Sequence, residues 1–350
     1  MRAWQLGPRP AAPRGPSEAI GFLTLAERPD PVAAPGELVV RVTAAGLNYR
    51  DLMVLRGVYG RDLPEHRIAL TDGVGVIEQV GKGVTGFAVG ERVIAANFTD
   101  WLGDGGYGYH VFASDLGVTR DGWLAERIVL PAAAAIRVPD AVSDDTAAAT
   151  AVVAGTVWHA MVAFGQVQPG DLVLTQGTGG VALYTLQLAK ALGATVSVTS
   201  SSDAKLARVR DMGADYTVNY RERPDWAAAL LEATGGRGAD VVVDTIGFAQ
   251  FGQTLAATGV EGRIATLGAL SGSPQDRPDF DQGALIGKNV TVKGIASGHR
   301  GMIEAALGVM AEHDIAMVID RSFAFEEAPV AYRHLLSGAH MGKVLVRVSG

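Results

Sequence analysis

The residues with the clearest chemical signature form a glycine turn, Gly177-Thr178-Gly179-Gly180-Val181-Ala182. An apolar run (172–175) predicts a strand before the turn, an amphipathic segment predicts a helix after it, and 195–199 predicts a second strand. In such a β-α-β unit the pyrophosphate of a dinucleotide lies on the helix N-terminus. Gly177 would make the tight turn, Gly179 would let the backbone approach phosphate, and Ala182 would pack helix against strand. The pattern predicts a dinucleotide site at Gly177, Thr178, Gly179, Gly180 and Val181; a glycine turn in another kind of α/β protein is the alternative.

The end of the second strand bears on cofactor choice. NAD sites usually place an acidic residue about twenty positions past the glycines, where it binds the ribose 2′-hydroxyl. This chain has Thr199-Ser200-Ser201-Ser202 there, followed by Asp203 in the first helical turn and by Lys205 and Arg208. Small hydroxyls and a cation suit a 2′-phosphate. We therefore expect NADPH rather than NADH, bound through Ser200, Ser201 and Lys205, unless the two cations are simply the solvated face of a helix.

Composition excludes several function classes. The chain has no cysteine, which removes thiol nucleophiles and thiolate zinc sites, and its seven histidines form no metal-binding motif. A net charge of −7 argues against nucleic acid as a partner. The N-terminal region lacks an apolar signal segment, and the longest apolar stretch, 147–164, is typical of a buried helix rather than a membrane span. We expect a cytoplasmic protein that binds neither membrane nor nucleic acid.

The elements that must position these residues follow two patterns. Up to about residue 130, short β-type runs at 37–44, 73–80 and 92–95 alternate with glycine and proline turns, with one helix at 49–56. From about residue 141 the chain is helical and then alternates strand and helix, which is the doubly wound pattern. The later predicted helices are 204–212, 225–234, 251–260, 302–313 and 328–337, and the later strands are 216–218, 240–244, 263–267, 290–295 and 343–348.

Five segments carry a resemblance to a known family: AAGLNYRDLMVLRGVYG (44–60), LTDGVGVIEQVG (70–81), VGERV (89–93), QLAKALGA (187–194) and VNYRE (218–222). With the glycine turn, they make the chain similar to the medium-chain dehydrogenase/reductases. The resemblance implies an α/β protein with a Rossmann doubly wound parallel sheet and a β-rich GroES-like catalytic domain. It assigns residues 1–152 and 299–350 to the catalytic domain and residues 153–298 to the Rossmann domain.

Departures from the zinc-dependent members of that family bear on the chemistry. Asn48 stands where they have a ligand cysteine, Leu70-Thr71-Asp72 replaces their G-H-E triplet, and their second ligand cysteine falls near Val152. The lobe that holds their structural zinc corresponds to the cysteine-free segment 97–120. We therefore expect no zinc. The chain resembles the zinc-free quinone oxidoreductase and enoyl reductase branches, close to bacterial proteins described as alcohol dehydrogenase-like.

The resemblance also suggests site residues. It implies that Asn48 hydrogen-bonds near the nicotinamide ribose or the substrate oxygen, and that Tyr59 lines the pocket and donates a proton. Thr156 would bind the nicotinamide amide, and Tyr220 would pack near the adenosine phosphate. The alternatives are a turn asparagine for Asn48, a half-buried core tyrosine for Tyr59 and a packing role for Thr156.

Three further interpretations concern side chains around this site. The aromatic residues of the 97–120 segment either form the wall of a substrate pocket or make a small core of their own: Trp101, Tyr107, Tyr109 and Phe112. Asp51 is expected to pair with Arg50 or to cap the helix that begins near it. A surface position on the closing strand is expected for Lys343, in preference to a reach toward the cofactor.

These observations predict a zinc-independent, NADPH-dependent oxidoreductase that transfers hydride to a quinone, an enone or another α,β-unsaturated carbonyl. One alternative is a metal-independent alcohol or carbonyl dehydrogenase, for which we identify no base. A second alternative is an NADPH-binding regulatory protein with little turnover. Strand 290–295, near the end of the Rossmann sheet, is expected to pair with its copy in a homodimer. The expected partner is otherwise a small-molecule substrate.

Overall fold

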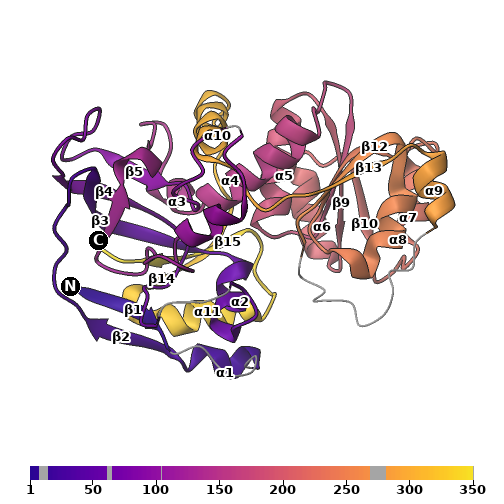
Figure 1. Ribbon diagram of the computed structural model, residues 1–350. Coiled ribbons are helices and arrows are strands. Elements are labelled where there is room, and N and C mark those ends of the chain that lie inside the picture. The colour runs from indigo at the N-terminus through magenta and orange to yellow at the C-terminus, as the bar shows by residue number, and fades with distance from the viewer. Residues whose placement is uncertain (8–14, 61–64, 104, 269–280, 350) are drawn as a thin grey trace. The chain divides into compact units, whose positions relative to one another are not determined.

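The computed structural model describes residues 1–7, 15–60, 65–103, 105–268 and 281–349. It divides into two compact units (Figure 1). Unit 1 contains Met1–Gly155 and His299–Gly350, and unit 2 contains Thr156–Gly298. The predicted fold class is confirmed, because one unit is built on a mainly antiparallel sheet and the other on a parallel one.

Unit 1 is the β-rich unit. A two-stranded sheet pairs β1 with β2, and a seven-stranded sheet has the order β14-β15-β3-β4-β5-β7, with β6 also paired to β3. The strands are β1 (Arg2–Leu6), β2 (Leu23–Glu27), β3 (Glu37–Leu47), β4 (Asp72–Val80), β5 (Arg92–Ala95), β6 (Arg127–Pro131), β7 (Ala135–Arg137), β14 (Ile319–Ala324) and β15 (Lys343–Arg347). The α-helices are α1 (Pro16–Ile20), α2 (Tyr49–Arg56), α3 (Asp144–Ala148), α4 (Ala151–Trp158, which continues into unit 2), α10 (Arg300–Glu312) and α11 (Ala328–Leu336).

The register of three neighbouring strands decides where the polar side chains of unit 1 meet. β15 runs antiparallel to β3, with Val344 opposite Leu47, and β3 runs antiparallel to β4, with Gly46 opposite Asp72. The start of β15, the end of β3 and the start of β4 therefore lie at the same end of the sheet. Residues far apart in the sequence are brought together there.

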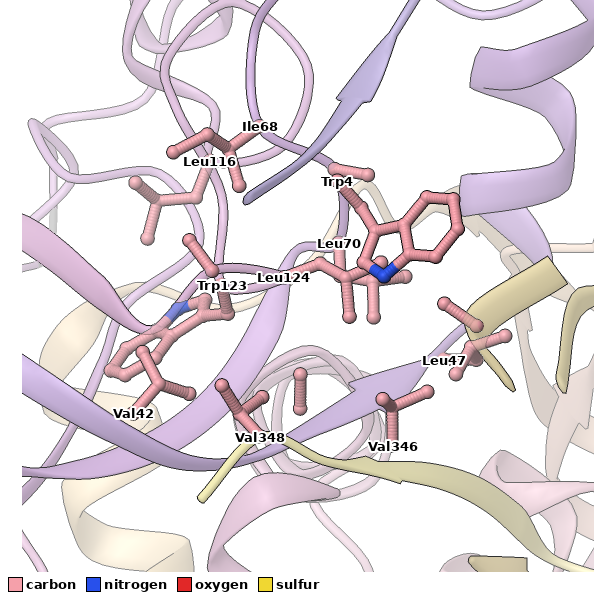
Figure 2. Packing of buried hydrophobic residues seen from close by; sticks show 14 of the residues in the cluster. Trp4, Val42, Leu47, Ile68, Leu70, Leu116, Trp123, Leu124, Val346 and Val348 are labelled. Atoms are coloured by element: carbon pink, nitrogen blue, oxygen red, sulfur yellow. The ribbon is translucent and has the colours of Figure 1, made fainter. Parts of the chain in front are cut away.

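The core of unit 1 packs aromatic and aliphatic side chains from both ends of the chain. Trp123 is fully buried beside Gly73 of β4, where an added Cβ would lie 2.6 Å from the indole ring. Figure 2 shows Trp4, Trp123 and Leu124 with Val346 of β15 and Val348, which follows that strand. Burying a side chain of this kind contributes about 1.5–3 kcal/mol, which helps to hold β15 in the sheet.

Unit 2 is the doubly wound unit. Its six strands are all parallel, in the order β10-β9-β8-β11-β12-β13, which is the 3-2-1-4-5-6 order of dinucleotide-binding sheets. The strands are β8 (Leu172–Gln176), β9 (Thr195–Ser200), β10 (Tyr216–Asn219), β11 (Ala239–Asp244), β12 (Thr258–Thr266) and β13 (Thr291–Gly294). The helices are α5 (Gly180–Ala191), α6 (Asp203–Asp211), α7 (Trp226–Ala233), α8 (Phe251–Ala257) and α9 (Gln282–Gly287).

Several elements differ from the prediction, among them one helix and one strand. The helix predicted at 251–260 ends at Ala257, and β12 begins at Thr258. Gly259 and the β-branched side chains on either side of it favour the extended conformation over a helix. Strand β14 was not predicted, because its sequence IDRSFA lacks an apolar alternation; it forms beside β15, which supplies its backbone partners.

The long apolar stretch at 147–164 is mostly helical, as predicted: it contains the end of α3, all of α4 and then a π-helix, η3 (His159–Phe164). Among the described residues there is no helix both long enough and apolar enough to cross a membrane.

Candidate active site

A buried polar array lies where β15, β3 and β4 meet. We define it as Asn48, Asp72 and Lys343, which are 8%, 0% and 4% exposed. The Lys343 ammonium donates to Asn48 Oδ1 at 2.6 Å, and Asn48 Nδ2 donates to Asp72 Oδ2 at 2.9 Å. Lys343 Nζ lies 3.6 Å from the same Asp72 oxygen. The prediction that Lys343 lies at the surface is wrong. The register of β15 places this residue beside the end of β3.

Asp72 is held by its second oxygen as well. The backbone N–H of Val152, in the first turn of α4, donates to Asp72 Oδ1 at 3.0 Å. A carboxylate at a helix N-terminus is favoured by the helix dipole and by the unpaired N–H groups there. Asp72 is therefore fixed on both oxygens, and it can orient the groups that bind to it.

A second buried carboxylate supports Asn48 from the helix side. Asp51 Oδ2 accepts from the Asn48 backbone N–H at 2.7 Å, and Asp51 Oδ1 accepts from the Thr71 hydroxyl at 3.0 Å. Asp51 thus caps helix α2, as one of the two interpretations expected. Burial raises the pKa of the Asp51 carboxyl to about 6, despite the hydrogen bond from the Asn48 backbone. The Asn48 carboxamide itself contacts Asp72 and Lys343.

Leu70 makes the bend that leads into this array. Its φ angle of 69° is in the left-handed region, which glycine adopts at no steric cost. Zinc-dependent relatives have the glycine of G-H-E at this position. Here a leucine occupies it, and its buried side chain packs in the core of unit 1. Core packing therefore offsets a conformational cost of about 1–2 kcal/mol.

Arg50 pairs with Asp115 rather than with Asp51. The Arg50 guanidinium donates to Asp115 Oδ2, and the two side chains are 10% and 0% exposed. The Arg50 guanidinium carbon also lies 4.7 Å from the centre of the Tyr59 ring. Burial raises the pKa of the Tyr59 phenol, although the Arg50 cation acts in the opposite direction. Tyr59 therefore stays protonated, as a hydrogen-bond donor must, and it is partly buried against the core.

The aromatic segment 97–120 forms a small core of its own. Trp101 is 4% exposed and packs with Phe98, Val111 and Phe112. Tyr107 lies over Trp101, with 4.9 Å between ring centroids, but is 51% exposed. Tyr109, at the start of the 3-10 helix η1 (Tyr109–Ser114), is 95% exposed. Of the two interpretations, the structure gives Trp101 the core role, and it brings neither Tyr107 nor Tyr109 into the buried polar array.

The residues at the positions of the zinc ligands do not fit a zinc ion. Asn48 offers a carboxamide oxygen that already accepts from an ammonium group. Thr71 gives its hydroxyl to Asp51, and Val152 has no ligating side chain. Among the described residues there is no group of three or more histidine, cysteine, aspartate or glutamate side chains that would hold a metal. The Lys343 cation in contact with Asn48 would repel a divalent metal.

In unit 2 the glycine turn is shaped by backbone conformation. Gly177 has φ 83° and donates its N–H to Thr199 O at 2.7 Å, which joins the end of β8 to β9. Gly179 is the N-cap of α5, and a Cβ there would meet nothing within 4 Å. Gly180 and Val181 open the helix, so their N–H groups have no acceptor within it. Thr178 is buried, and Ala182 is buried where the helix packs.

The end of β9 places small hydroxyl groups at the candidate phosphate site. Ser200 is buried, Ser201 is half-buried, and Ser202 caps α6 by accepting from the Lys205 N–H. The Asp203 carboxylate is engaged elsewhere, because it accepts a hydrogen bond from Asn219 Nδ2 at 2.8 Å. Lys205 is half-buried, and Tyr220 is 39% exposed, with its N–H donating to Ser200 O. Thr156 is a buried residue of α4.

The roles of two site residues were missed by sequence reasoning. Asp72 and Lys343 were noted as parts of motifs, but neither was assigned to the site. The sequence feature that could have located Lys343 is the apolar run that follows it, which predicts a strand in the interior of a sheet. The first residue of such a strand lies beside the end of a neighbouring strand rather than in solvent.

Comparisons with known proteins agree with this architecture. A family model described as alcohol dehydrogenase GroES-like domain matches residues 34–140, and one described as zinc-binding dehydrogenase matches residues 180–312. A zinc-type alcohol dehydrogenase-like protein of Schizosaccharomyces pombe is 37% identical over 320 residues, covering 90% of this chain and 91% of that protein. An acryloyl-coenzyme A reductase of Sulfurisphaera tokodaii is 30% identical over 333 residues, covering 92% of this chain and 96% of that protein.

Among solved structures, a crystal structure of an NAD-dependent alcohol dehydrogenase matches with a TM-score of 0.88 at 33% identity, covering 100% of both chains. The chain belongs to the medium-chain dehydrogenase/reductase superfamily. It is an NAD(P)-dependent oxidoreductase.

Proposed function

We propose that this protein is a zinc-independent, NADPH-dependent reductase of conjugated carbonyl compounds. The observation that carries the proposal is the Lys343 ammonium bound to Asn48, at the place where zinc-dependent relatives ligate their metal. A metal acts there as a Lewis acid on an alcohol or a saturated carbonyl. Conjugated acceptors need less activation, because the charge that develops on hydride addition spreads over the π-system.

When bound, NADPH supplies a hydride to the electrophilic β-carbon of the substrate. Asn48 donates an N–H to the carbonyl oxygen, where the negative charge of the enolate develops. Tyr59 then gives its phenolic proton to the α-carbon and is reprotonated from solvent, so that one hydride and one proton saturate the double bond. The raised pKa of Tyr59 keeps that proton in place until the enolate forms.

The residues at the end of β9 support NADPH. A 2′-phosphate would meet the hydroxyls of Ser200 and Ser201 and the cation of Lys205, and no acidic side chain occupies 199–202. Tyr220 directly follows the next strand, β10, and would pack near the adenosine phosphate. The competing candidate is NADH, which the name of the NAD-dependent structural relative favours.

The substrate class is supported by the name of a relative. The Sulfurisphaera tokodaii protein is an acryloyl-coenzyme A reductase by name, and acryloyl groups are α,β-unsaturated carbonyls. The alternative, an alcohol or saturated-carbonyl dehydrogenase, is favoured by the names of the other two relatives. It requires a catalytic base for the alcohol, and the array around Asn48 contains carboxylates that are already fixed by hydrogen bonds.

The exposed edge of strand β13 supports a homodimer. β13 is the last strand of its sheet, and all four of its residues are exposed. Ile286 of α9 and Val260 of β12, also in unit 2, are 70% and 72% exposed. An exposed strand edge with apolar side chains nearby invites a second copy. Val292→Pro should give monomers by light scattering; a dimer that persists would argue against this interface.

Oxidation of NADPH over matched substrates tests the proposal. One panel contains enones, quinones and acryloyl thioesters, and the other contains their saturated counterparts, with alcohols and NADP⁺ run in reverse. We expect turnover with the conjugated panel alone. Turnover with saturated carbonyls or alcohols would support the dehydrogenase alternative. Tight NADPH binding with no turnover in either panel would support a regulatory role.

A further inference from the structure

Lys343 is a buried cation to which the chemistry above gives no role. It is 4% exposed, and within the part of the chain that the structure describes its ammonium contacts Asn48 at 2.6 Å and Asp72 at 3.6 Å. Burial lowers the pKa of Lys343, and the carboxylates of Asp72 and Asp51 oppose that shift. A methionine of similar shape would fill the same space at the start of β15, so packing alone does not require a charge here.

The two charges fix the orientation of the Asn48 carboxamide. Its oxygen faces the ammonium of Lys343, and its nitrogen faces the carboxylate of Asp72. A flipped carboxamide would set N–H groups against the ammonium donors and its oxygen against the carboxylate. Both contacts would then be repulsive, so one orientation is strongly preferred.

This orientation leaves one N–H available. A carboxamide nitrogen carries two N–H groups, and Asn48 Nδ2 uses one of them to bind Asp72 Oδ2. The described residues include no acceptor for the other. A cation bound at the carboxamide oxygen withdraws electron density from the nitrogen, which makes the remaining N–H a stronger donor. The array is thus built to present one polarised N–H.

We propose that Lys343 is a positioning residue, whose ammonium fixes and polarises the Asn48 carboxamide so that the second N–H binds the developing enolate oxygen. The inference rests on the proposed function, which gives Asn48 the substrate oxygen. In this account a lysine cation acts indirectly, through a carboxamide, at the place where zinc-dependent relatives hold a metal. The charge that stabilises the reaction is supplied by the protein itself.

A double-mutant cycle on the full-length protein tests the coupling. Lys343→Met should lower kcat by roughly 10- to 100-fold with little change in the KM for NADPH. Lys343→Arg keeps a cation and a donor and should retain most of the turnover. In an Asn48→Ala background, Lys343→Met should cost no more than about twofold further, because its effect passes through Asn48. Equal losses in both backgrounds would overturn the proposal.

Arg92→Met is the matched control for stability. Arg92 binds the carbonyls of Pro139 and Val142 and the Asp144 carboxylate in the same unit, and it has no part in the array. We expect it to lower the melting temperature without lowering kcat. If Lys343→Met behaves in the same way, with a lower melting temperature and an unchanged kcat, Lys343 is structural and the proposal fails.

A second readout separates this inference from the proposed function. The side-chain amide signals of Asn48, identified by their loss in Asn48→Ala, report polarisation in ¹H–¹⁵N spectra without turnover. Lys343→Met should shift them, and Lys343→Arg should largely restore them. If the wild-type protein reduces no conjugated acceptor, the proposed function fails while this shift still supports the positioning. Unchanged Asn48 signals in Lys343→Met would overturn the positioning itself.

Discussion

The two sheet ends that carry the candidate sites are built in different ways. At the end of β8 in unit 2, backbone groups form the site: Gly177 supplies a left-handed turn and Gly179 leaves open space at the start of α5. In unit 1, the meeting point of β15, β3 and β4 is filled with buried charged and polar side chains. The first site would receive phosphate through N–H groups and shape, and the second is organised by charge.

This difference between the two sites determines which amino-acid substitutions each of them tolerates. A backbone site depends on the φ angles of a few residues and on the absence of a Cβ. A site of paired charges depends on every partner, because the removal of one leaves another charge buried without compensation. Substitutions in unit 1 should therefore affect turnover and pH dependence, whereas substitutions in unit 2 should affect cofactor affinity.

The largest effect is expected from removal of the Asn48 carboxamide. Asn48→Ala deletes the donor to the enolate oxygen and leaves Lys343 and Asp72 in contact. Loss of one such donor typically lowers kcat by about 10²–10³-fold. Steady-state kinetics with an enone should show this loss, while fluorescence titration should show unchanged NADPH binding. An unchanged kcat would remove Asn48 from the mechanism.

The next effect concerns the pH dependence of stability. The pKa of Asp51 is raised from 3.8 to about 6, so the folded protein binds a proton more tightly than the unfolded chain does. The resulting stabilisation is present below about pH 4 and is lost as the pH rises through 6; it amounts to about 3 kcal/mol at most. In Asp51→Asn, the decline in the free energy of unfolding between pH 4 and pH 7 should be smaller than in the wild type.

Urea unfolding at several pH values measures this decline, and the exposed site Asp140→Asn serves as the control. Parallel pH profiles for the wild type and Asp51→Asn would show that Asp51 does not titrate in this range.

A smaller effect is expected at the cofactor end of β9. Lys205→Ala removes a cation that would bind the 2′-phosphate, and a hydrogen bond to a charged group contributes about 1.5–3 kcal/mol. The Kd for NADPH should rise about tenfold, and that for NADH should hardly change. Arg208→Ala, on the exposed face of the same helix, is the comparison. Equal weakening of both cofactors would refute the 2′-phosphate assignment.

The smallest effects separate the two glycines of the turn. Gly177→Ala forces an alanine to φ 83°, at a cost of about 1–2 kcal/mol in the free energy of unfolding. Gly179→Ala places its Cβ in open space, so the melting temperature should not change while NADPH binding weakens. Thermal unfolding and titration of both variants measure this contrast. A loss of stability in Gly179→Ala would show that the open space belongs to the fold.

The same contrast explains what the sequence predicted. The glycine turn and the doubly wound sheet were predicted because their signals are local: a strand, a turn and a helix in about thirty consecutive residues. Lys343 was placed wrongly, because its partners at positions 48 and 72 are distant in the sequence and are set by strand pairing. The aromatic segment was left undecided, since spacing does not tell whether Trp101 faces its neighbours or a ligand.

The central claim is that a lysine–asparagine array takes the place of the metal in this protein. The most direct test follows NADPH oxidation with an enone before and after exhaustive treatment with a chelator, and again after zinc is added back. We predict that the rate stays the same in all three states. Loss of activity on metal removal, with recovery on addition of zinc, would contradict the account.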